Sequence, residues 1–321
     1  MRIFDVVTFG SAVLDIFVSY DKTGISLKNK RKGIFLPLGE KLEGEKIFFY
    51  SGGGGTNSAA TFGNQGLKTA FCGMIGKDFT GKIVLEDLKK FNIDKRFVLK
   101  TDKKLTGISI IFSGKKGKVI LPYRGASRLL SIKDIPFKDI KAKWFYLAPL
   151  SGKLVKNFLK IIDFAQRNGI KTAFNPSKYQ LKSLDIKKAL KKVNILILNQ
   201  EEAGFLTKIP FQREKSVFKK LDEVVDGICI MTKGNQGVTV SDGKFLYTAP
   251  ILKTELIDAT GAGDSFGSGF VAQYIKNNNI ISAIQFAIAN STANIKKWGA
   301  KDGILKKGQK WKKVNVKIQK L

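Results

Sequence analysis

The sequence contains no histidine and only two cysteines among its 321 residues. Without histidine, Ser-His-Asp and Cys-His catalysis are excluded, and a zinc site lacks most of its usual ligands. Cys72 and Cys229 each lie in an apolar, strand-like run, which favours buried core positions over metal or redox chemistry. General-base chemistry must therefore fall to a carboxylate or a lysine.

Long apolar runs are also missing. No run reaches the roughly 18 residues that a membrane span needs. The opening residues, MRIFDVVTFGSAVLDIFVSYD, meet acids too early for a secretion signal. We therefore expect a cytoplasmic protein with no membrane partner.

Acidic residues are scarce, with 26 against 57 basic ones and a formal net charge of +31. Such a charge can serve nucleic-acid binding or an anionic substrate. The lysines are spread through the whole chain, however, and no RNA-reading aromatic motif or helix-turn-helix stands out. A generally lysine-rich surface is favoured over a specific nucleic-acid partner.

Short β-branched or aromatic runs alternate with amphipathic segments of helix length. This alternation predicts an α/β fold with a mainly parallel central sheet and helices on both faces. We expect strands at Ile3–Gly10, Thr69–Gly73, Trp144–Leu147, Thr172–Asn175, Ile195–Leu198 and Gly227–Thr232. We expect helices at Asn57–Gln65, Gly81–Phe91, Lys153–Arg167, Glu201–Leu206, Asp264–Lys276 and Ile281–Lys297.

Two regions, residues 15–51 and 106–123, break this rhythm with alternating strands and glycine turns. Inserted between βα units, they predict a small β-sheet lid on an α/β domain made of residues 1–14, 52–105 and 124–321.

One strand of the lid carries Ile108, Ile110 and Phe112 in alternation, so one face is too apolar to remain bare. That face should cover a substrate pocket or pair with the lid of a second copy, which makes a homodimer through the lid an open alternative. Because water must be kept from a reacting group, we also expect substrate to close the lid.

Three turns follow predicted strands and carry glycine, amide or acid side chains. Gly52–Gly66 reads SGGGGTNSAATFGNQG, and it matches neither a Walker loop nor a dinucleotide fingerprint. LNQEEAG contains Asn199 and Glu202, and MTKGNQG contains Thr232, Gly234 and Gly237. Each by itself is also compatible with an ordinary turn or with an acid that a helix start favours.

A fourth stretch, DATGAGDSFGSGF, is more informative. GAGD before a helix presents successive backbone N–H groups at a helix N-terminus, where the dipole favours anions. Asp264 stands at the same terminus and could accept a proton from a hydroxyl. A base beside an anion-binding turn is typical of phosphoryl transfer.

These motifs resemble, in content and in order, those of the ribokinase-like, PfkB-type carbohydrate and nucleoside kinases. The resemblance spans roughly residues 3–303 and includes GSAVLD, GGGGTN, GMIGKDFTG, NQEE, TKGNQG, DATGAGD and KWGA. It implies an ATP-dependent kinase that requires Mg²⁺.

The resemblance also implies a role for each matching position. Asp264 would be the catalytic base, and the backbone of Gly261, Ala262 and Gly263 the anion hole for the γ-phosphate. The acceptor's hydroxyls would be held by Asp15, Gly53, Gly54 and Asn57. Asn199 and Glu202 would organise magnesium through water, and Thr232, Gly234, Gly237 and Gly263 would bind nucleotide. Asp258 and Thr260 resemble positions around a monovalent cation such as K⁺, and Lys297–Ala300 would border that region and the adenine pocket.

Three departures argue against ribose as the acceptor. Ribose kinases have lysine at Gly54, asparagine at Val13 and a glutamate near Ala148, and lost polar groups cost affinity. Arg124 could instead bind a carboxylate or phosphate, although a solvated arginine is equally compatible.

A sugar or sugar acid is therefore expected first and a nucleoside second, since Phe17, Phe35 and Phe112 could stack on a base. Rival readings are a nucleotide-binding oxidoreductase, a basic nucleic-acid-binding protein and a catalytically inactive regulator. The poor dinucleotide fingerprint disfavours the first, and intact GAGD and NQEE disfavour the last.

Overall fold

The computed structural model describes residues 3–19, 25–28, 31–34, 36, 38–41, 43–114 and 117–321. Among these residues, ten strands form the main sheet in the order β16-β15-β14-β13-β12-β11-β10-β1-β6-β7. The pairs from β7 to β13 are parallel, and β14, β15 and β16 extend the sheet in antiparallel fashion. The predicted mainly parallel α/β sheet is confirmed.

The strands of the main sheet are β1 (Phe4–Phe9), β6 (Thr69–Gly76), β7 (Val98–Thr101), β10 (Ala142–Leu147), β11 (Lys171–Phe174), β12 (Ile195–Asn199), β13 (Ile228–Thr232), β14 (Val238–Ser241), β15 (Phe245–Ala249) and β16 (Lys317–Lys320). The helices are α1 (Gly54–Asn64), α2 (Phe79–Lys90), α3 (Phe158–Arg167), α4 (Lys178–Leu181), α5 (Ile186–Leu190), α6 (Gln200–Thr207), α7 (Glu214–Asp222), α8 (Ala262–Asn277) and α9 (Ile280–Asn294).

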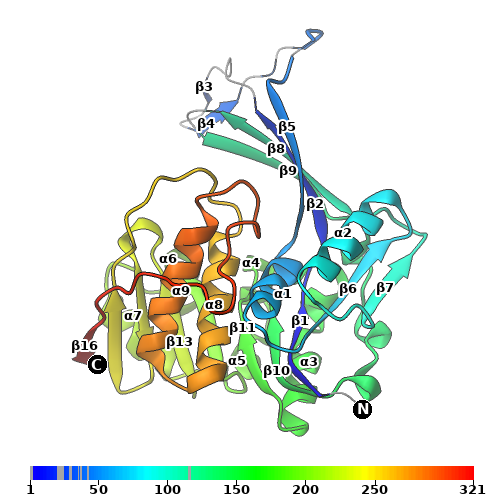
Figure 1. Cartoon of the computed structure of the whole chain (residues 1–321). Helices are drawn as coiled ribbons and strands as arrows, with labels where there is room; N and C mark the ends of the chain where they lie inside the picture. The colour runs from blue at the N-terminus through cyan, green and yellow to red at the C-terminus, as the bar shows by residue number, and fades with distance from the viewer. Residues whose placement is uncertain are drawn as a thin grey trace.

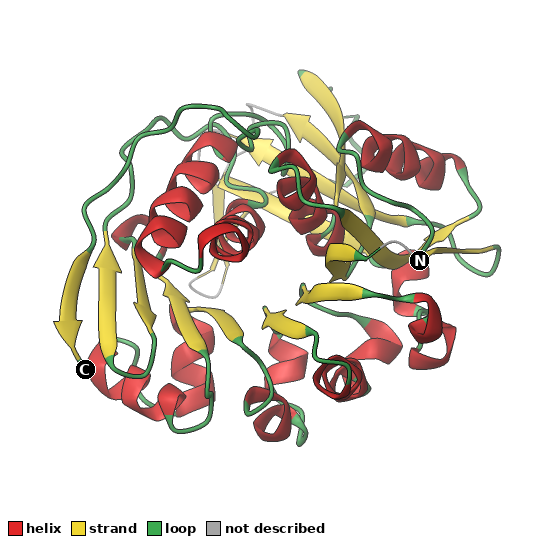
Figure 2. Cartoon of the chain, turned by 60° about the horizontal axis from the view of Figure 1, so that its bottom comes forward, coloured by secondary structure: helices red, strands yellow, loops and turns green. Residues whose placement is uncertain are grey.

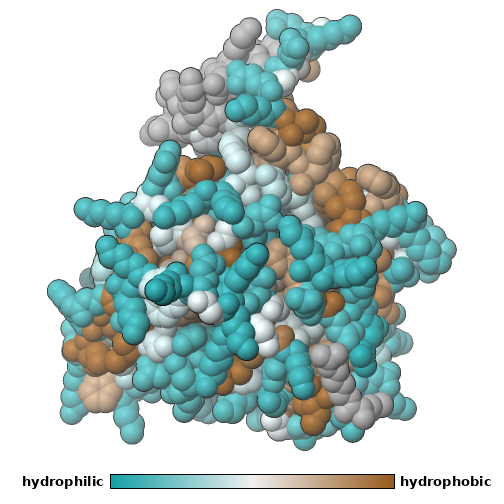
Figure 3. Space-filling model, in the orientation of Figure 1, coloured by the Kyte–Doolittle hydropathy of each residue, from teal (hydrophilic) through white to brown (hydrophobic). Residues whose placement is uncertain are grey.

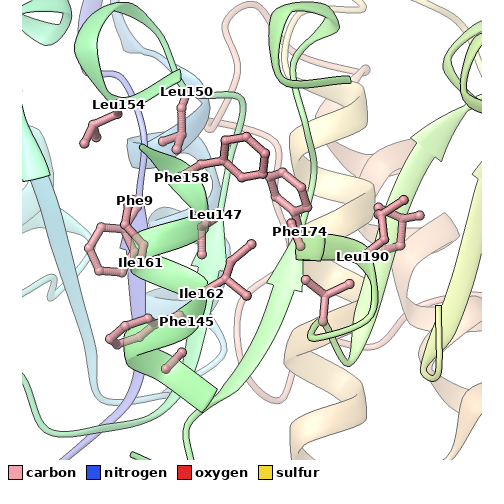
Figure 4. Packing of buried hydrophobic residues seen from close by; sticks show 14 of the residues in the cluster. Phe9, Phe145, Leu147, Leu150, Leu154, Phe158, Ile161, Ile162, Phe174 and Leu190 are labelled. Carbon is pink, nitrogen blue, oxygen red and sulfur yellow. The ribbon is translucent and has the colours of Figure 1, made fainter. Parts of the chain in front are cut away.

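Helices cover both faces of the sheet (Figures 1 and 2). Alternate residues of β1 show how the core divides, because side chains of a strand point to opposite faces. Val7 packs in the cluster under α3, α5 and α7, whereas Val6 packs in the cluster under α8 and α9. In Figure 4, buried side chains of α3 such as Phe158 and Ile162 lie over Phe145, Leu147 and Phe174 of the sheet.

One predicted helix is wrong in its first part. Instead of running through Lys153–Arg167, the chain makes a 3₁₀ turn at Gly152–Lys156 and begins α3 only at Phe158. Between them, the Asn157 side chain donates to the Lys153 carbonyl at 3.2 Å. This side-chain bond offers the backbone an alternative to continuous helix. The last predicted helix also ends earlier than expected, at Asn294.

A second, four-stranded sheet stands at one end of the molecule (Figure 1). This small sheet has the order β5-β2-β8-β9 and consists of β2 (Val13–Ser19), β5 (Lys46–Gly52), β8 (Gly107–Gly114) and β9 (Gly117–Tyr123). A separate pair, β3 (Ile25–Lys28) with β4 (Arg31–Ile34), belongs to the same region of the sequence. The division of the chain into a kinase domain and an inserted lid at the expected boundaries stays a prediction.

The register of the small sheet assigns its two faces. Asp15 pairs with Ser109 and Phe17 with Ile111, so these side chains share the inner face, and Ser109 and Ile111 are buried. Phe112 pairs with Val18 and lies on the opposite, outer face. Of the two roles expected for the face of Ile108, Ile110 and Phe112, covering the pocket does not fit, because strict alternation places this face opposite Asp15, and pairing with a second copy stays a prediction.

No helix within the described ranges is both long and apolar enough to cross a membrane.

Candidate active site

The glycine-rich turn between β5 and α1 presses bare backbone against a carboxylate. A Cβ on Gly52 would lie 1.9 Å from Oδ2 of Asp15, and one on Gly53 would lie 2.5 Å from the carbonyl oxygen of Ser11. Gly53 also has φ +97°, a conformation that L side chains rarely adopt. Because the backbone lies this close to Asp15 and Ser11, consecutive glycines are required in this turn.

Asp15 is 5% exposed and projects from β2 into this turn. Burial raises the pKa of its carboxyl, while a hydrogen bond with Ser109 and the charge of Lys301 lower it. The negative charges of Asp258 and Asp264 add to the increase in pKa, which places three carboxylates within electrostatic range of one another.

Asp264 lies in the first turn of α8 and is held by the turn that begins α1. Nδ2 of Asn57 donates to Oδ2 of Asp264 at 2.8 Å. Burial raises the pKa of the Asp264 carboxyl, and the Asn57 hydrogen bond and the Lys301 charge oppose this shift. The structure thus brings together the expected base and an expected acceptor-binding residue.

One polar atom of the Asn57 side chain makes no hydrogen bond to a described residue. Its Oδ1 is buried and has no hydrogen-bond partner among the described residues. Since buried polar atoms are nearly always satisfied, this oxygen is positioned to accept from a bound molecule.

Lys301 is a site residue that sequence reasoning missed. It is 4% exposed, and its Nζ contacts Oδ2 of Asp87 at 2.6 Å, Oγ of Ser51 at 2.9 Å and Oγ1 of Thr56 at 3.3 Å. The ammonium therefore joins α2, the end of β5 and the start of α1. Its only sequence signal is that it directly follows KWGA, and its partners lie more than 200 residues away.

The turn before α8 is the one expected to form an anion hole, and that role stays a prediction. Gly261 caps the helix with φ +73°, and a Cβ there would lie 2.6 Å from Cβ of Ala300. A Cβ on Gly263 would meet nothing within 4 Å, so the backbone at this point is open. The Ala262 N–H donates to the Ala259 carbonyl at 3.2 Å, and the N-terminus of this 16-residue helix is, through its dipole, suited to a phosphate.

A cavity of about 430 Å³ adjoins this turn and brings the expected nucleotide residues together. It is lined by Thr232, Gly234 and Gly237 after β13 and by Ala262 and Gly263 of α8. Its volume lies in the range of small-molecule sites. Sequence reasoning missed the apolar part of the lining, which comes from Ile251, Leu252, Leu256, Phe266, Ile288 and Ile295.

Asn199 and Glu202 form a capping box at the start of α6. Oδ1 of Asn199 accepts from the Glu202 N–H at 2.8 Å, and Oε2 of Glu202 accepts from the Asn199 N–H at 2.9 Å. Burial raises the pKa of Glu202, and the hydrogen bond from the Asn199 backbone and the charge of Lys178 lower it. Asn199 pairs with Thr232 across β12 and β13, so the box lies next to a residue that lines the cavity of about 430 Å³, although neither Asn199 nor Glu202 lines it.

Asp258 and Thr260, the residues expected around a monovalent cation, contact a lysine of the small sheet. Nζ of Lys118 lies 2.9 Å from Oδ1 of Asp258 and 2.6 Å from Oγ1 of Thr260. The N–H of Gly299 donates to Oδ2 of Asp258 at 3.2 Å, so part of Lys297–Ala300 does border this region. A role of that segment at adenine stays a prediction.

The remaining expected residues lie in different places. Arg124 is exposed where β9 ends, and its role stays a prediction. Phe17 contacts Tyr50 and Trp298 on the inner face, whereas Phe112 lies on the outer one. Phe35 lies outside the described residues.

Comparison with known proteins identifies the class to which this fold and site belong. The profile of the pfkB family carbohydrate kinases matches residues 13–307. The chain therefore belongs to the ribokinase-like PfkB carbohydrate kinase family, and it is a phosphotransferase with an alcohol group as acceptor. Kinases of this family use ATP.

Individual relatives differ in their acceptors. The ribokinase of Haemophilus influenzae is 29% identical over 285 residues, which cover 84% of this chain and 89% of that protein. The cytidine kinase of Thermococcus kodakarensis is 26% identical over 254 residues, covering 77% and 88%. The structure of Arabidopsis thaliana ribokinase complexed with ribose and ATP matches with a TM-score of 0.77 over 95% of this chain and 96% of that one. At 20% identity, this last likeness shows the fold alone.

A substitution in the turn between β5 and α1 tests whether steric overlap, in addition to backbone strain, requires glycine there. Gly53→Ala should lower the free energy of unfolding by about 2 to 4 kcal/mol, because the new methyl group meets the Ser11 carbonyl in addition to a disfavoured φ. The matched control is Gly169→Ala, where φ is +65° but an added Cβ meets nothing within 4 Å, with an expected loss of about 1 kcal/mol. Urea unfolding measures both, and equal losses would contradict the steric argument.

Proposed function

We propose that this protein transfers the γ-phosphate of ATP to a hydroxyl group of a sugar or sugar acid, with Asp264 as the base. One observation carries the proposal. The carboxylate of Asp264 is bonded to Asn57 of the acceptor turn, while the backbone of the same first turn of α8 opens onto the cavity of about 430 Å³. Acceptor and donor would therefore meet at this carboxylate.

The residues divide the chemistry between them. Asp264 would accept the proton of the acceptor hydroxyl, whose oxygen then bonds to the γ-phosphorus as the bond to ADP breaks. The N–H groups of the turn Gly261–Gly263 would stabilise the negative charge on the transferred group. When bound, Mg²⁺ would neutralise phosphate charge, with Glu202 holding its hydration shell and Asn199 orienting Glu202.

The acceptor pocket supports a polyhydroxylated molecule other than ribose. Asp15 and the unpartnered Oδ1 of Asn57 can accept hydrogen bonds from hydroxyl groups. Two of the three departures from ribose kinases form one wall, because a Cβ on Gly54 would lie 3.3 Å from Cβ of Ala148 and 3.4 Å from Oδ1 of Asp264. This wall offers no side-chain hydrogen bond, and it packs closely around Gly54 next to the base.

A nucleoside is the second candidate, and a specific observation favours it. Trp298 stacks on Phe48 with ring centroids 5.5 Å apart and meets Phe17 edge-on at 5.8 Å. Phe17 is buried, whereas Phe48 and Trp298 are half-buried at the inner face of the small sheet, where a base could stack on them. The expected cytoplasmic location stays a prediction, and a specific nucleic-acid partner is not part of the proposal.

The experiment is an assay of ADP formation with a panel of neutral sugars, sugar acids and nucleosides. We expect turnover with a sugar or sugar acid and weaker turnover with ribose. Turnover of nucleosides alone would contradict the acceptor class but not the kinase activity. Absence of acceptor-dependent ADP formation across the panel would contradict the proposal.

Asp264→Asn is the inactive control for this assay. It should lower kcat by about 100-fold or more, since a neutral amide cannot take the proton, while nucleotide affinity is kept. In the wild type, kcat/KM should fall as the pH drops through the pKa of Asp264. Because burial raises that pKa above the ordinary 3.8, the acid limb should lie at higher pH than an exposed aspartate would give. Near-normal turnover of the variant would remove Asp264 from the mechanism.

Glu202→Gln tests the magnesium role separately from the helix cap, because glutamine also completes a capping box. It should raise the Mg²⁺ concentration for half-maximal rate by about tenfold or more, with the melting temperature nearly unchanged. Glu201→Gln is the control, since it makes the same charge change at the adjacent exposed position. The same Mg²⁺ dependence in both variants would contradict the role of Glu202.

We also propose that two copies pair through the outer face of the small sheet. Phe49 and Leu121 there are 57% and 62% exposed, and Figure 3 shows hydrophobic residues gathered on this part of the surface. Leu121→Lys should convert a dimer into a monomer in light scattering, because it buries a charge in the interface. Ile120→Lys, one residue away on the inner face, should leave the dimer intact. A wild type that is monomeric at every concentration would contradict this pairing.

A further inference from the structure

Lys118 is the charged link between the small sheet and the loop that leads into the anion hole. It pairs with Ser113 in the β8–β9 register, which places it on the same face as Ile111, Ser109 and Asp15. From there its ammonium reaches Asp258 and Thr260, about 140 residues further along the chain.

The Asp258 carboxylate is almost completely buried, with a side-chain exposure of 3%. It accepts hydrogen bonds from the Thr260 N–H at 3.0 Å, the Thr260 hydroxyl at 2.7 Å and the Gly299 N–H at 3.2 Å. These neutral donors fix its position but do not balance its charge. A buried carboxylate requires a cation, and Lys118 supplies one.

The loop that Asp258 holds is the one that forms the anion hole. Thr260 directly precedes Gly261, and Nδ2 of Asn294 fixes the Thr260 carbonyl at 3.0 Å. The resemblance implies a monovalent cation beside Asp258 and Thr260, and the Lys118 ammonium already contacts Oδ1 of Asp258 and Oγ1 of Thr260. The side chains present therefore fit an internal ammonium, and they do not leave the site to K⁺.

We propose that the Lys118 ammonium takes the place of a bound monovalent cation at the anion-hole loop. This kinase then needs no K⁺, and its anion hole is complete only when the small sheet lies against that loop. Lys118 is thus a positioning residue, which acts on the phosphate site through Asp258. The inference rests on the proposed phosphoryl transfer at Gly261–Gly263.

A second contact holds the small sheet against the same loop, next to Asp258. Trp298 stacks on Phe48 of β5, and the next residue, Gly299, donates its N–H to Asp258. A Cβ on Gly299 would lie 2.8 Å from the Tyr50 ring, so the loop and the sheet are in close contact. The ion pair with Lys118 and the stacking of Trp298 therefore both connect the small sheet to the surroundings of the Asp258 carboxylate.

The test is chemical rescue of Lys118→Met, which keeps an unbranched apolar stem but removes the charge. Rates are compared in KCl and in choline chloride at about 0.1 M, so that screening is equal. The wild type should have the same kcat in both salts. The variant should lose about tenfold in kcat in choline and regain most of it in KCl or NH₄Cl. Lys46→Met, on exposed β5 of the same sheet, should behave like the wild type.

A second readout does not depend on the acceptor. Stabilisation of the protein by ADP, measured as the shift in melting temperature at equal ionic strength, should be the same in KCl and choline chloride for the wild type and should depend on K⁺ in Lys118→Met. If no acceptor is phosphorylated, the proposed function fails and this readout still decides the role of Lys118.

A wild type that requires K⁺ would overturn the inference. So would a Lys118→Met variant whose rate and ADP response do not change with the cation.

Discussion

The hydrogen bond between Asn57 and Asp264 spans 207 residues of sequence and joins the first turns of two helices. The arrangement of the active site depends on it. Helices α1 and α8 pack against each other, so their N-termini open at the same edge of the sheet. One terminus carries the glycine-rich turn that we propose receives the acceptor, and the other the turn that we propose receives phosphate. A single side-chain contact fixes the distance between the two reactants.

Two lysines with different ion-pair partners, Asp87 and Asp258, reduce the negative charge around this contact. Lys301 is buried beneath the acceptor turn and lowers the pKa values of both Asp15 and Asp264. Lys118 is partly exposed and compensates Asp258 from the small sheet. Three carboxylates in one site would repel one another strongly without these cations. The first lysine follows α9 in the main domain, whereas the second belongs to β9 of the small sheet.

The local parts of this site were predictable from sequence, and the contacts between distant parts were not. Consecutive glycines and GAGD before a helix report backbone geometry within a few residues, so Gly53 and the α8 start could be predicted. The partners of Lys301 lie in three separate elements, and no local pattern encodes them. The alternation of apolar side chains along β8 indicated an apolar face of the small sheet. Only the pairing of β8 with β2 shows that Asp15 lies on the opposite face.

The edge strands of the main sheet give part of the lysine-rich composition a structural role. Its two outermost strands, β7 and β16, are four residues long, with Lys100 in one and Lys317 and Lys320 in the other. Short, positively charged edge strands resist pairing with a sheet from another molecule, because like charges would be brought together. Part of the excess positive charge thus protects the folded protein from aggregating along its own hydrogen-bonding edges.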